Sequence, residues 1–269
     1  MADSRPIGVF DSGVGGLTVL REIHDRLPSE STIYLGDLKH FPYGPRYPTE
    51  VRGFAFDIIR YLQGRDVKLV VIACNTATAA ALSQARETFD VPIVGVIGPG
   101  AHAAVEATRK GLVGVISTEG TAASQEYLHA IKEIDPMVGV FQKACPELVD
   151  IVEQGDADSP RAEVALERDL AEIVKLGADV LVLGCTHYPL LKPAIGRIYP
   201  GCFQLVDSAS TTAEKVRRQL EHANLLADGA RPQHEIVVTS VPERFNEVAE
   251  ILFGERVPEV TEVDIWEAK

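Results

Sequence analysis

Short runs of β-branched and other apolar residues alternate with longer helical patterns along almost the whole chain, and this alternation most constrains the fold. Parallel strands need crossover connections of this kind, and the helices then cover the sheet. Apolar residues recur at helical spacing over residues 51–62 and 166–174. Ser159-Pro160 opens the second of these helices and Gly177 ends it, as helix caps prefer. The sequence therefore predicts an α/β protein with mainly parallel sheets.

The pattern places nine strands and indicates two related halves. The predicted strands are 7–10, 32–35, 69–73, 93–96, 112–116, 138–141, 180–183, 203–206 and 236–239. Segments 70–78 (VVIACNTAT) and 180–188 (VLVLGCTHY) have the same order of strand, small residue, cysteine and polar residue. Each half then carries one cysteine just past the carboxyl end of a strand, where open α/β sheets bind ligands.

Charge and cysteine usage exclude several classes of protein. The chain has 26 Lys and Arg against 39 Asp and Glu, a net charge of −13, which argues against a nonspecific nucleic-acid or anionic-membrane surface. Its four cysteines form no CxxC pair and no zinc-finger spacing. The sequence shows no secretory signal and no apolar run long enough to cross a membrane. We expect a cytoplasmic protein without a structural metal, in which Cys145 and Cys202 are structural.

Cys74 and Cys185 are the candidate reactive groups. A single buried cysteine after a strand is often only a small core residue, but two in matching contexts favour a chemical role. A helix N-terminus lowers the pKa of a thiol, so we expect a thiolate near neutral pH. His187 lies two residues from Cys185 and titrates near neutrality. A protease-like Cys/His pair is the alternative, although such a pair would leave Cys74 without a role.

Two further segments follow predicted strands. The loop DSGVGG (11–16) lacks the spacing of a dinucleotide fingerprint or a P-loop, so it is weak evidence for a phosphate site. Asp11 is either a helix N-cap or a carboxylate directed into the cleft. The segment YLGDLKHFPYG (34–44) adds Asp37, Pro42, Tyr43 and Gly44, which otherwise form a simple turn.

Two opposed thiols in related halves suit proton exchange at a stereocentre. One base removes a proton from one face of the carbon while an acid supplies a proton on the other, and the reverse reaction exchanges their roles. Two residues of the same type therefore fit the task.

The motifs IGVFDSGVGGLTVL, YLGDLKHFPYG, ACNTAT and LGCTHYPLL occur in this order, and together they resemble the glutamate racemases of the cofactor-independent aspartate/glutamate racemase superfamily. The resemblance runs from Ile7 to about Leu220. It implies two pseudo-symmetric α/β domains, 1–98 plus 208–269 and 99–207, with the active site in the cleft between them.

The resemblance also implies roles for individual residues. Cys74 and Cys185 are the acid and base, Asp11 and His187 help them exchange protons, and Glu153 has an assisting role. The implied substrate-binding residues are Asp11, Ser12, Tyr43, Gly44, Asn75, Thr76, Thr118, Thr121, Thr186 and His187. No metal and no cofactor are implied.

The resemblance implies biological expectations as well. L-glutamate and D-glutamate are the expected ligands, the protein is expected to form a homodimer, and D-glutamate supplies cytoplasmic peptidoglycan synthesis. Gly98 stands where many relatives carry glutamate. Only six residues precede the first predicted strand, so we expect no dependence on a cell-wall nucleotide activator.

Two alternatives stay open at this point. One is a different substrate within the superfamily, such as aspartate. The other is a non-enzymatic role, either as a protein that closes on an acidic ligand or as a protein inhibitor, for example of DNA gyrase.

Overall fold

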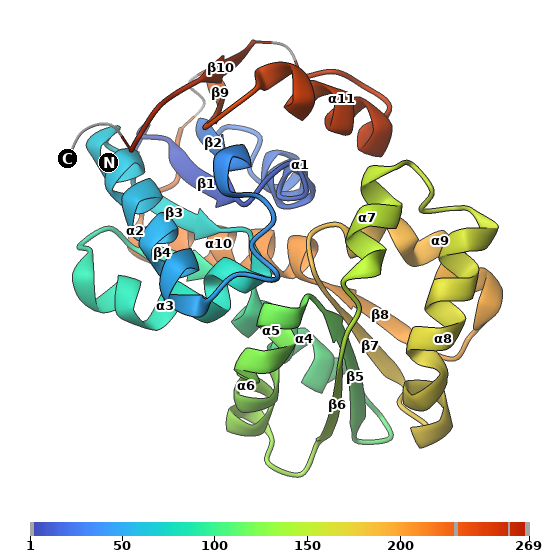
Figure 1. Cartoon of the computed structure of the whole chain (residues 1–269). Helices are drawn as coiled ribbons and strands as arrows, with labels where there is room; N and C mark the ends of the chain where they lie inside the picture. Colours follow the sequence, from blue (N-terminus) through green and yellow to red (C-terminus); the bar gives the residue numbers. More distant parts are fainter. Residues whose placement is uncertain (1–2, 229–230, 258, 267–269) are drawn as a thin grey trace.

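Two separate parallel sheets organise the protein (Figure 1). The structure is a computed structural model that describes residues 3–228, 231–257 and 259–266. One sheet has six strands in the order β10-β9-β2-β1-β3-β4, and the other has four in the order β6-β5-β7-β8. Every strand pairs with its neighbours in parallel. The predicted α/β class with parallel sheets is confirmed.

The six-stranded sheet is built from both ends of the chain. Its strands are β1 (Ile7–Asp11), β2 (Thr32–Gly36), β3 (Leu69–Ile72), β4 (Ile93–Gly95), β9 (His234–Val238) and β10 (Val260–Glu262). The helices that connect them are α1 (Leu17–Arg26), η1 (Leu38–His40), α2 (Pro48–Gly64), α3 (Asn75–Thr88) and α11 (Pro242–Phe253).

The four-stranded sheet comes from the middle of the chain. Its strands are β5 (Leu112–Ser117), β6 (Gly139–Ala144), β7 (Val180–Gly184) and β8 (Gln204–Asp207). Its helices are α5 (Glu119–Ser124), α6 (Glu126–Ile134), α7 (Glu147–Glu153), α8 (Pro160–Leu176), η2 (Tyr188–Leu191) and α9 (Lys192–Ile198).

Two helices carry the chain between the sheets. Helix α4 (Ile97–Ala107) follows β4 and leads into the four-stranded sheet, and α10 (Ser208–Ala223) follows β8 and leads back. The two helices contact each other, and α10 also packs along α1. The predicted domains, 1–98 plus 208–269 and 99–207, would assign one sheet to each domain, and these boundaries stay a prediction.

All nine predicted strands are present, with shifted ends. The largest difference is at β6, which continues to Ala144 through polar but partly buried residues. Strand β10 was not predicted, because its three residues are too few for a period-2 pattern. The structural role expected for Cys202 is wrong in one respect: this cysteine is exposed and packs in no core, whereas Cys145 is buried.

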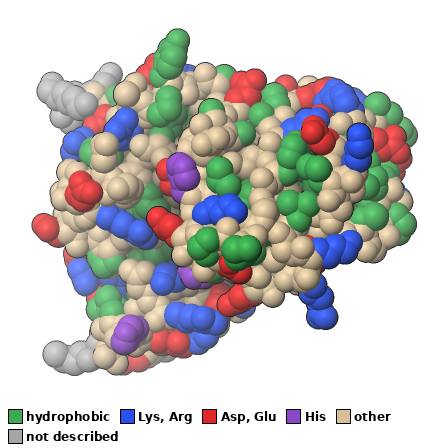
Figure 2. Space-filling model, turned by 90° about the horizontal axis from the view of Figure 1, so that it is seen from below, with side chains coloured by type: hydrophobic (Ala, Val, Ile, Leu, Met, Phe, Trp, Pro, Cys, Tyr) green, Lys and Arg blue, Asp and Glu red, His purple; other side chains and the backbone are tan. Residues whose placement is uncertain are grey.

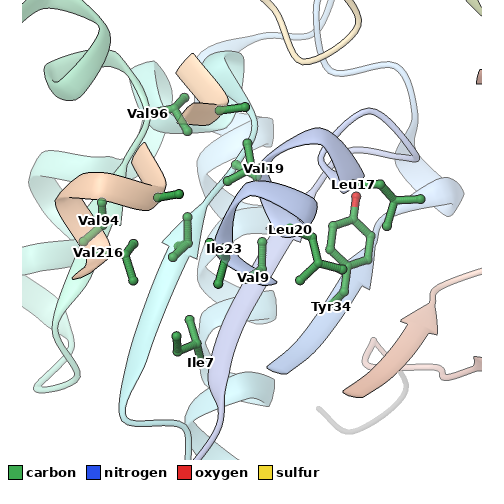
Figure 3. Close-up of a cluster of buried hydrophobic side chains, with 14 of the residues drawn as sticks. Ile7, Val9, Leu17, Val19, Leu20, Ile23, Tyr34, Val94, Val96 and Val216 are labelled. Carbon is green, nitrogen blue, oxygen red and sulfur yellow. The ribbon is translucent and has the colours of Figure 1, made fainter. Parts of the chain in front are cut away.

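Helix α1 shows how sequence pattern becomes packing. Leu17, Leu20 and Ile23 lie on one face and are buried against the six-stranded sheet. Figure 3 shows this cluster, in which Val9 of β1 and Val216 of α10 pack against the same helix. Complete burial stabilises such side chains by about 1.5 to 3 kcal/mol each. The packing holds the strand ends that carry the site.

The capping predictions for α8 are confirmed. The Ser159 side chain accepts a hydrogen bond from the backbone N–H of Ala162, and Pro160 is the first helical residue. Gly177 follows the helix with φ of 82°, in the left-handed region that favours glycine.

The surface is charged and mixed. Figure 2 shows Lys and Arg side chains interspersed with Asp and Glu side chains on the face seen from below. Within the described part of the chain, no helix is both long enough and apolar enough to span a membrane.

Candidate active site

The site forms where the carboxyl ends of the strands meet. Asp11 of β1 pairs in register with Gly36, and Ala73, just after β3, donates its N–H to the carbonyl of Phe10 at 2.8 Å. In the other sheet, Ser117 pairs with Gly184. Cys74 and Cys185 therefore follow central strands of the two sheets.

A cavity of about 200 Å³ is lined by residues from both sheets. Ten of the predicted site residues line it: Ser12, Tyr43, Gly44, Cys74, Asn75, Thr76, Thr118, Cys185, Thr186 and His187. Asp11 and Thr121 are outside the lining and lie behind it, fully buried. Glu153 is also outside the lining and contacts His187.

Cys74 caps helix α3. Its Sγ accepts a hydrogen bond from the backbone N–H of Ala77 at 3.5 Å and lies 3.9 Å from Ser12 Oγ. Burial, with the charge of Asp11 as the next cause, raises the pKa of Cys74 to about 12. The N–H of Ala77 at the helix N-terminus does lower this pKa, but the expected thiolate near neutral pH is wrong for Cys74, because desolvation of the buried sulfur outweighs that contribution. Cys74 holds its proton at neutral pH.

Cys185 has a different partner. Its Sγ lies 3.8 Å from Nδ1 of His187, and Nε2 of the same ring lies 3.2 Å from Oε1 of Glu153. Burial lowers the pKa of His187, but the hydrogen bonds to Cys185 and Glu153 outweigh it and raise the pKa to about 10. The imidazole is thus a cation at neutral pH and stabilises negative charge on the neighbouring sulfur.

Asp11 connects the two sheets from behind the cavity. Its Oδ2 accepts the backbone N–H of Gly13 at 3.1 Å, and its Oδ1 accepts the Thr186 hydroxyl at 3.5 Å. Burial raises its pKa, while the positive charge of His187 opposes the shift. The N-cap alternative is excluded, since Gly16 holds the N-cap position of α1.

The DSGVGG loop packs against the second half instead of forming an open anion cradle. A Cβ on Gly15 would lie 2.4 Å from Thr186 Oγ1 and 2.8 Å from the His187 ring. Only glycine allows this close approach of the loop to the Cys185 segment.

Three threonine hydroxyls form a cluster at one side of the cavity. Thr76 Oγ1 lies 2.8 Å from Thr118 Oγ1 and 3.3 Å from Thr121 Oγ1, and Thr118 donates to Thr121 at 3.0 Å. Thr118 also caps α5. The cluster brings together α3 of one sheet and α5 of the other.

Tyr43 and Gly44 lie on a loop that hydrogen bonds hold in place. The Tyr43 hydroxyl donates to Oδ2 of Asp37 at 2.5 Å, and Thr239 donates to Oδ1 of the same carboxylate at 2.7 Å. The carbonyl of Gly44 accepts the N–H of Gly120 at 2.9 Å, so this loop also touches the second half.

Six lining residues are not predicted from the sequence: Phe41, Pro45, Glu119, Pro146, Val149 and Asp150. Phe41 lies inside the quoted motif 34–44 and Pro45 directly follows it, but the face that α7 turns to the cavity follows from tertiary packing alone. No Lys or Arg is among the described lining residues. An anionic ligand must therefore be held by the His187 cation, hydroxyls and backbone N–H groups, including those at the N-terminus of α3.

The arrangement fits acid–base chemistry and shows no cluster for a metal. Among the described residues, no group of three or more His, Cys, Asp or Glu side chains could hold a metal ion. The cavity instead offers two thiols, each beside a titratable partner.

The chain is similar to known racemases over nearly its whole length. Residues 7–216 match the family described as Asp/Glu/Hydantoin racemase. The chain is 45% identical to a glutamate racemase of Geobacter metallireducens, covering 97% of each sequence. It resembles the crystal structure of the glutamate racemase isoform RacE1 from Bacillus anthracis, at 41% identity and a TM-score of 0.93, with 97% of each chain covered. A Francisella tularensis glutamate racemase, solved in complex with D-glutamate, is 31% identical, with a TM-score of 0.91 and coverage of 98% of this chain and 99% of that one.

Proposed function

Because the chain belongs to the Asp/Glu/Hydantoin racemase family, we propose that it is an amino-acid racemase that interconverts L-glutamate and D-glutamate. Its similarity to proteins named glutamate racemases extends over nearly the whole chain and favours glutamate over aspartate. We propose Cys74 and Cys185 as the acid and the base.

One observation carries the mechanism: two thiols reach the same cavity from equivalent positions, each just beyond a central strand of a different sheet. A substrate between them presents opposite faces of its α-carbon to the two sulfurs. The protein then has one proton-transfer group for each face.

The proton balance is simple. A thiolate on one side takes the α-proton, the C–H bond breaks, and its electron pair remains on the α-carbon. The thiol on the other side then gives its proton to the opposite face. The thiol and the thiolate have exchanged places, and no electron has been transferred.

The two sides differ in how they manage charge. We propose that the protonated Cys74 acts as the acid and that Cys185, which faces the His187 cation, acts as the base. In the reverse direction Cys74 must become the base, with Asp11 behind it as the group that exchanges protons. Glu153 orients the His187 ring by a hydrogen bond to Nε2 and helps to keep it protonated.

Substrate carboxylates are held without Lys or Arg. Backbone N–H groups at the start of α3 and α5, and the hydroxyls of Thr76, Thr118 and Thr186, are the available donors. The remaining proposed binding residues are Asp11, Ser12, Tyr43, Gly44, Asn75, Thr121 and His187. We propose no cofactor and no metal, because the thiols and their partners supply both proton transfers.

The decisive experiment follows optical activity by circular dichroism with L-glutamate alone, in buffer with a thiol reductant and no cofactor. We expect the signal to decay to zero, while L-aspartate stays unchanged. Cys74→Ser and Cys185→Ser each should nearly abolish racemisation in both directions. Full activity in either variant would overturn the two-thiol mechanism, and turnover of aspartate alone would overturn the substrate.

The biological setting is proposed on the same basis. D-glutamate produced in the cytoplasm would supply peptidoglycan synthesis and so support cell shape, and the protein would act as a homodimer. Light scattering on the purified protein tests the dimer, and depletion in a bacterial host, with rescue by added D-glutamate, tests the role in the cell wall.

A further inference from the structure

Tyr127 is a buried residue that connects the two halves of the site although it lies outside the cavity. It belongs to α6, and its side chain is 0% exposed. Its hydroxyl donates to Oδ1 of Asn75 at 2.8 Å. Asn75 directly follows Cys74 and is the first residue of α3. The phenol therefore joins a helix of the four-stranded sheet to the segment that carries the first thiol.

The ring of Tyr127 touches the segment that carries the second thiol. Gly184 directly precedes Cys185, and a Cβ on Gly184 would lie 3.0 Å from Cε2 of Tyr127. The position also contacts the crossover helix, since a Cβ on Gly100 of α4 would lie 3.3 Å from the hydroxyl oxygen. One side chain thus meets the neighbours of both cysteines.

Tyr127 makes a polar contact through its hydroxyl and an apolar contact through its ring. The hydrogen bond from the hydroxyl to Asn75 is buried, and an unpaired amide oxygen there would cost free energy, so the bond is retained. Asn75 in turn donates to Ser208 Oγ, at the start of α10, at 3.5 Å. The Asn75 amide therefore joins the second sheet and the returning crossover to α3.

We propose that Tyr127 is a positioning residue that sets the separation of Cys74 and Cys185. This inference rests on the proposed two-thiol reaction, in which both sulfurs must lie about 3 to 3.5 Å from the reacting atoms on opposite faces of one carbon. A tether between Asn75 and Gly184 keeps both sulfurs within that range. A misplacement of about 1 Å can lower such a rate about 100-fold.

The first test is Tyr127→Phe, which keeps the ring and removes the hydroxyl. We expect kcat to fall about 10-fold to 100-fold in both directions with little change in KM. With glutamate deuterated at the α-carbon, the primary isotope effect on kcat should rise, because proton transfer becomes slower relative to the other steps. A variant that is only less completely folded would lose activity with its isotope effect and KM unchanged, and that result would overturn the proposal.

A second pair of variants separates positioning from stability. Gly100→Ala adds a methyl group 3.3 Å from the Tyr127 hydroxyl oxygen, so the ring must shift by a few tenths of an ångström, while the higher helix propensity of alanine in α4 offsets part of the cost in stability. We expect kcat to drop about 3-fold to 10-fold and the isotope effect to rise. Gly98→Ala is the matched control, because it lies in the same helix and its Cβ would meet nothing within 4 Å. Equal kinetics in the two variants would contradict the proposal.

The rate of cysteine alkylation does not depend on turnover, so it tests the role of Tyr127 separately from the proposed racemase activity. Wild-type racemisation of L-glutamate decides the proposed function, and alkylation of the two cysteines by iodoacetamide, followed by peptide mass spectrometry, decides the role of Tyr127. Loss of the tether should free the N-terminus of α3 and speed alkylation of Cys74 at least about threefold in Tyr127→Phe. Wild-type alkylation rates in that variant would overturn the positioning role whatever the substrate.

Discussion

Glu153 and His187 form a hydrogen-bonded ion pair, with Oε1 of the glutamate 3.2 Å from Nε2 of the histidine. The two residues lie on different elements, at the end of α7 and just before η2. His187 faces Cys185 with its other nitrogen. The carboxylate thus acts on the thiol through the imidazole.

Glu153→Gln should shift the alkaline limb of the pH–rate profile to lower pH. Burial lowers the pKa of His187, and the bonds to Cys185 and Glu153 raise it to about 10, so removing one negative partner brings it down. The cation is then lost at lower pH, and we expect kcat at pH 8 to fall about tenfold, less than for loss of an acid–base group itself. Glu147→Gln, on the same helix but partly exposed and paired with Arg168 instead of His187, is the control. Identical pH profiles for the two variants would contradict the role of Glu153.

Asp11→Asn should have opposite effects on the reactivity of Cys74 and on racemisation. The pKa of Cys74 is raised by burial and next by the charge of Asp11, so loss of that charge lowers it from about 12 while burial keeps it above the ordinary 9.0. Alkylation of Cys74 between pH 8 and 10 should therefore accelerate. Racemisation should still fall about 10-fold or more, because the buried proton acceptor behind the thiol is gone. Parallel changes in both measurements would refute this assignment.

Much of the fold could be predicted from sequence because its signals are local. Parallel strands buried on both faces appear as continuous apolar runs, which is why strands such as β3 and β7 were placed within a residue of their observed ends. The same topology explains the site, since side chains that follow neighbouring parallel strands must gather at one edge. Cys74 and Cys185 could be chosen on that ground together with the matching sequences around them.

The rest depends on contacts that no local pattern encodes. Tyr127 and Asn75 are 52 residues apart, and nothing around Tyr127 distinguishes it from an ordinary core tyrosine. Val149 and Asp150 line the cavity only because α7 packs with that face inward. The pKa of Cys74 is raised because the thiol is completely buried. The sequence indicates that a helix begins at this cysteine, but it does not indicate how deeply the thiol is buried.

Lys68 should be essential for stability and dispensable for catalysis. Its buried ammonium donates to the carbonyls of Asp3 at 2.6 Å and Leu225 at 2.8 Å and lies 2.5 Å from Glu30 Oε2. Lys68→Met leaves the carboxylate buried and unpaired, so we expect a loss of about 3 to 5 kcal/mol in the free energy of unfolding, measured with urea. Glu30→Gln keeps an acceptor for Lys68 and should cost less. Activity per folded molecule should not change, because Lys68 precedes β3 at the end of the strand remote from the cavity.

His24 and His234 should make the fold sensitive to acid. Both rings contact the Thr32 hydroxyl, at 2.9 and 3.0 Å, and their centroids are 4.1 Å apart. Burial, and after it the neighbouring His234, lower the pKa of His24 from 6.5 to about 4, against the opposing charge of Asp25. Above pH 6.5 the ring is neutral in both the folded and the unfolded state. As the pH falls from 6.5 to 4, His24 binds a proton in the unfolded chain but stays neutral in the folded protein. The free energy of unfolding therefore declines across this window.

We expect that decline to be about 1 to 2 kcal/mol after allowance for solvent screening at a half-buried ring. Urea unfolding at pH 7.0, 5.5 and 4.5 measures it. His24→Gln should flatten the dependence, because the amide cannot titrate, and His222→Gln, at an exposed histidine near the end of α10, should leave it unchanged. If the slope with pH is the same in His24→Gln and in the wild type, another group causes the loss of stability in acid.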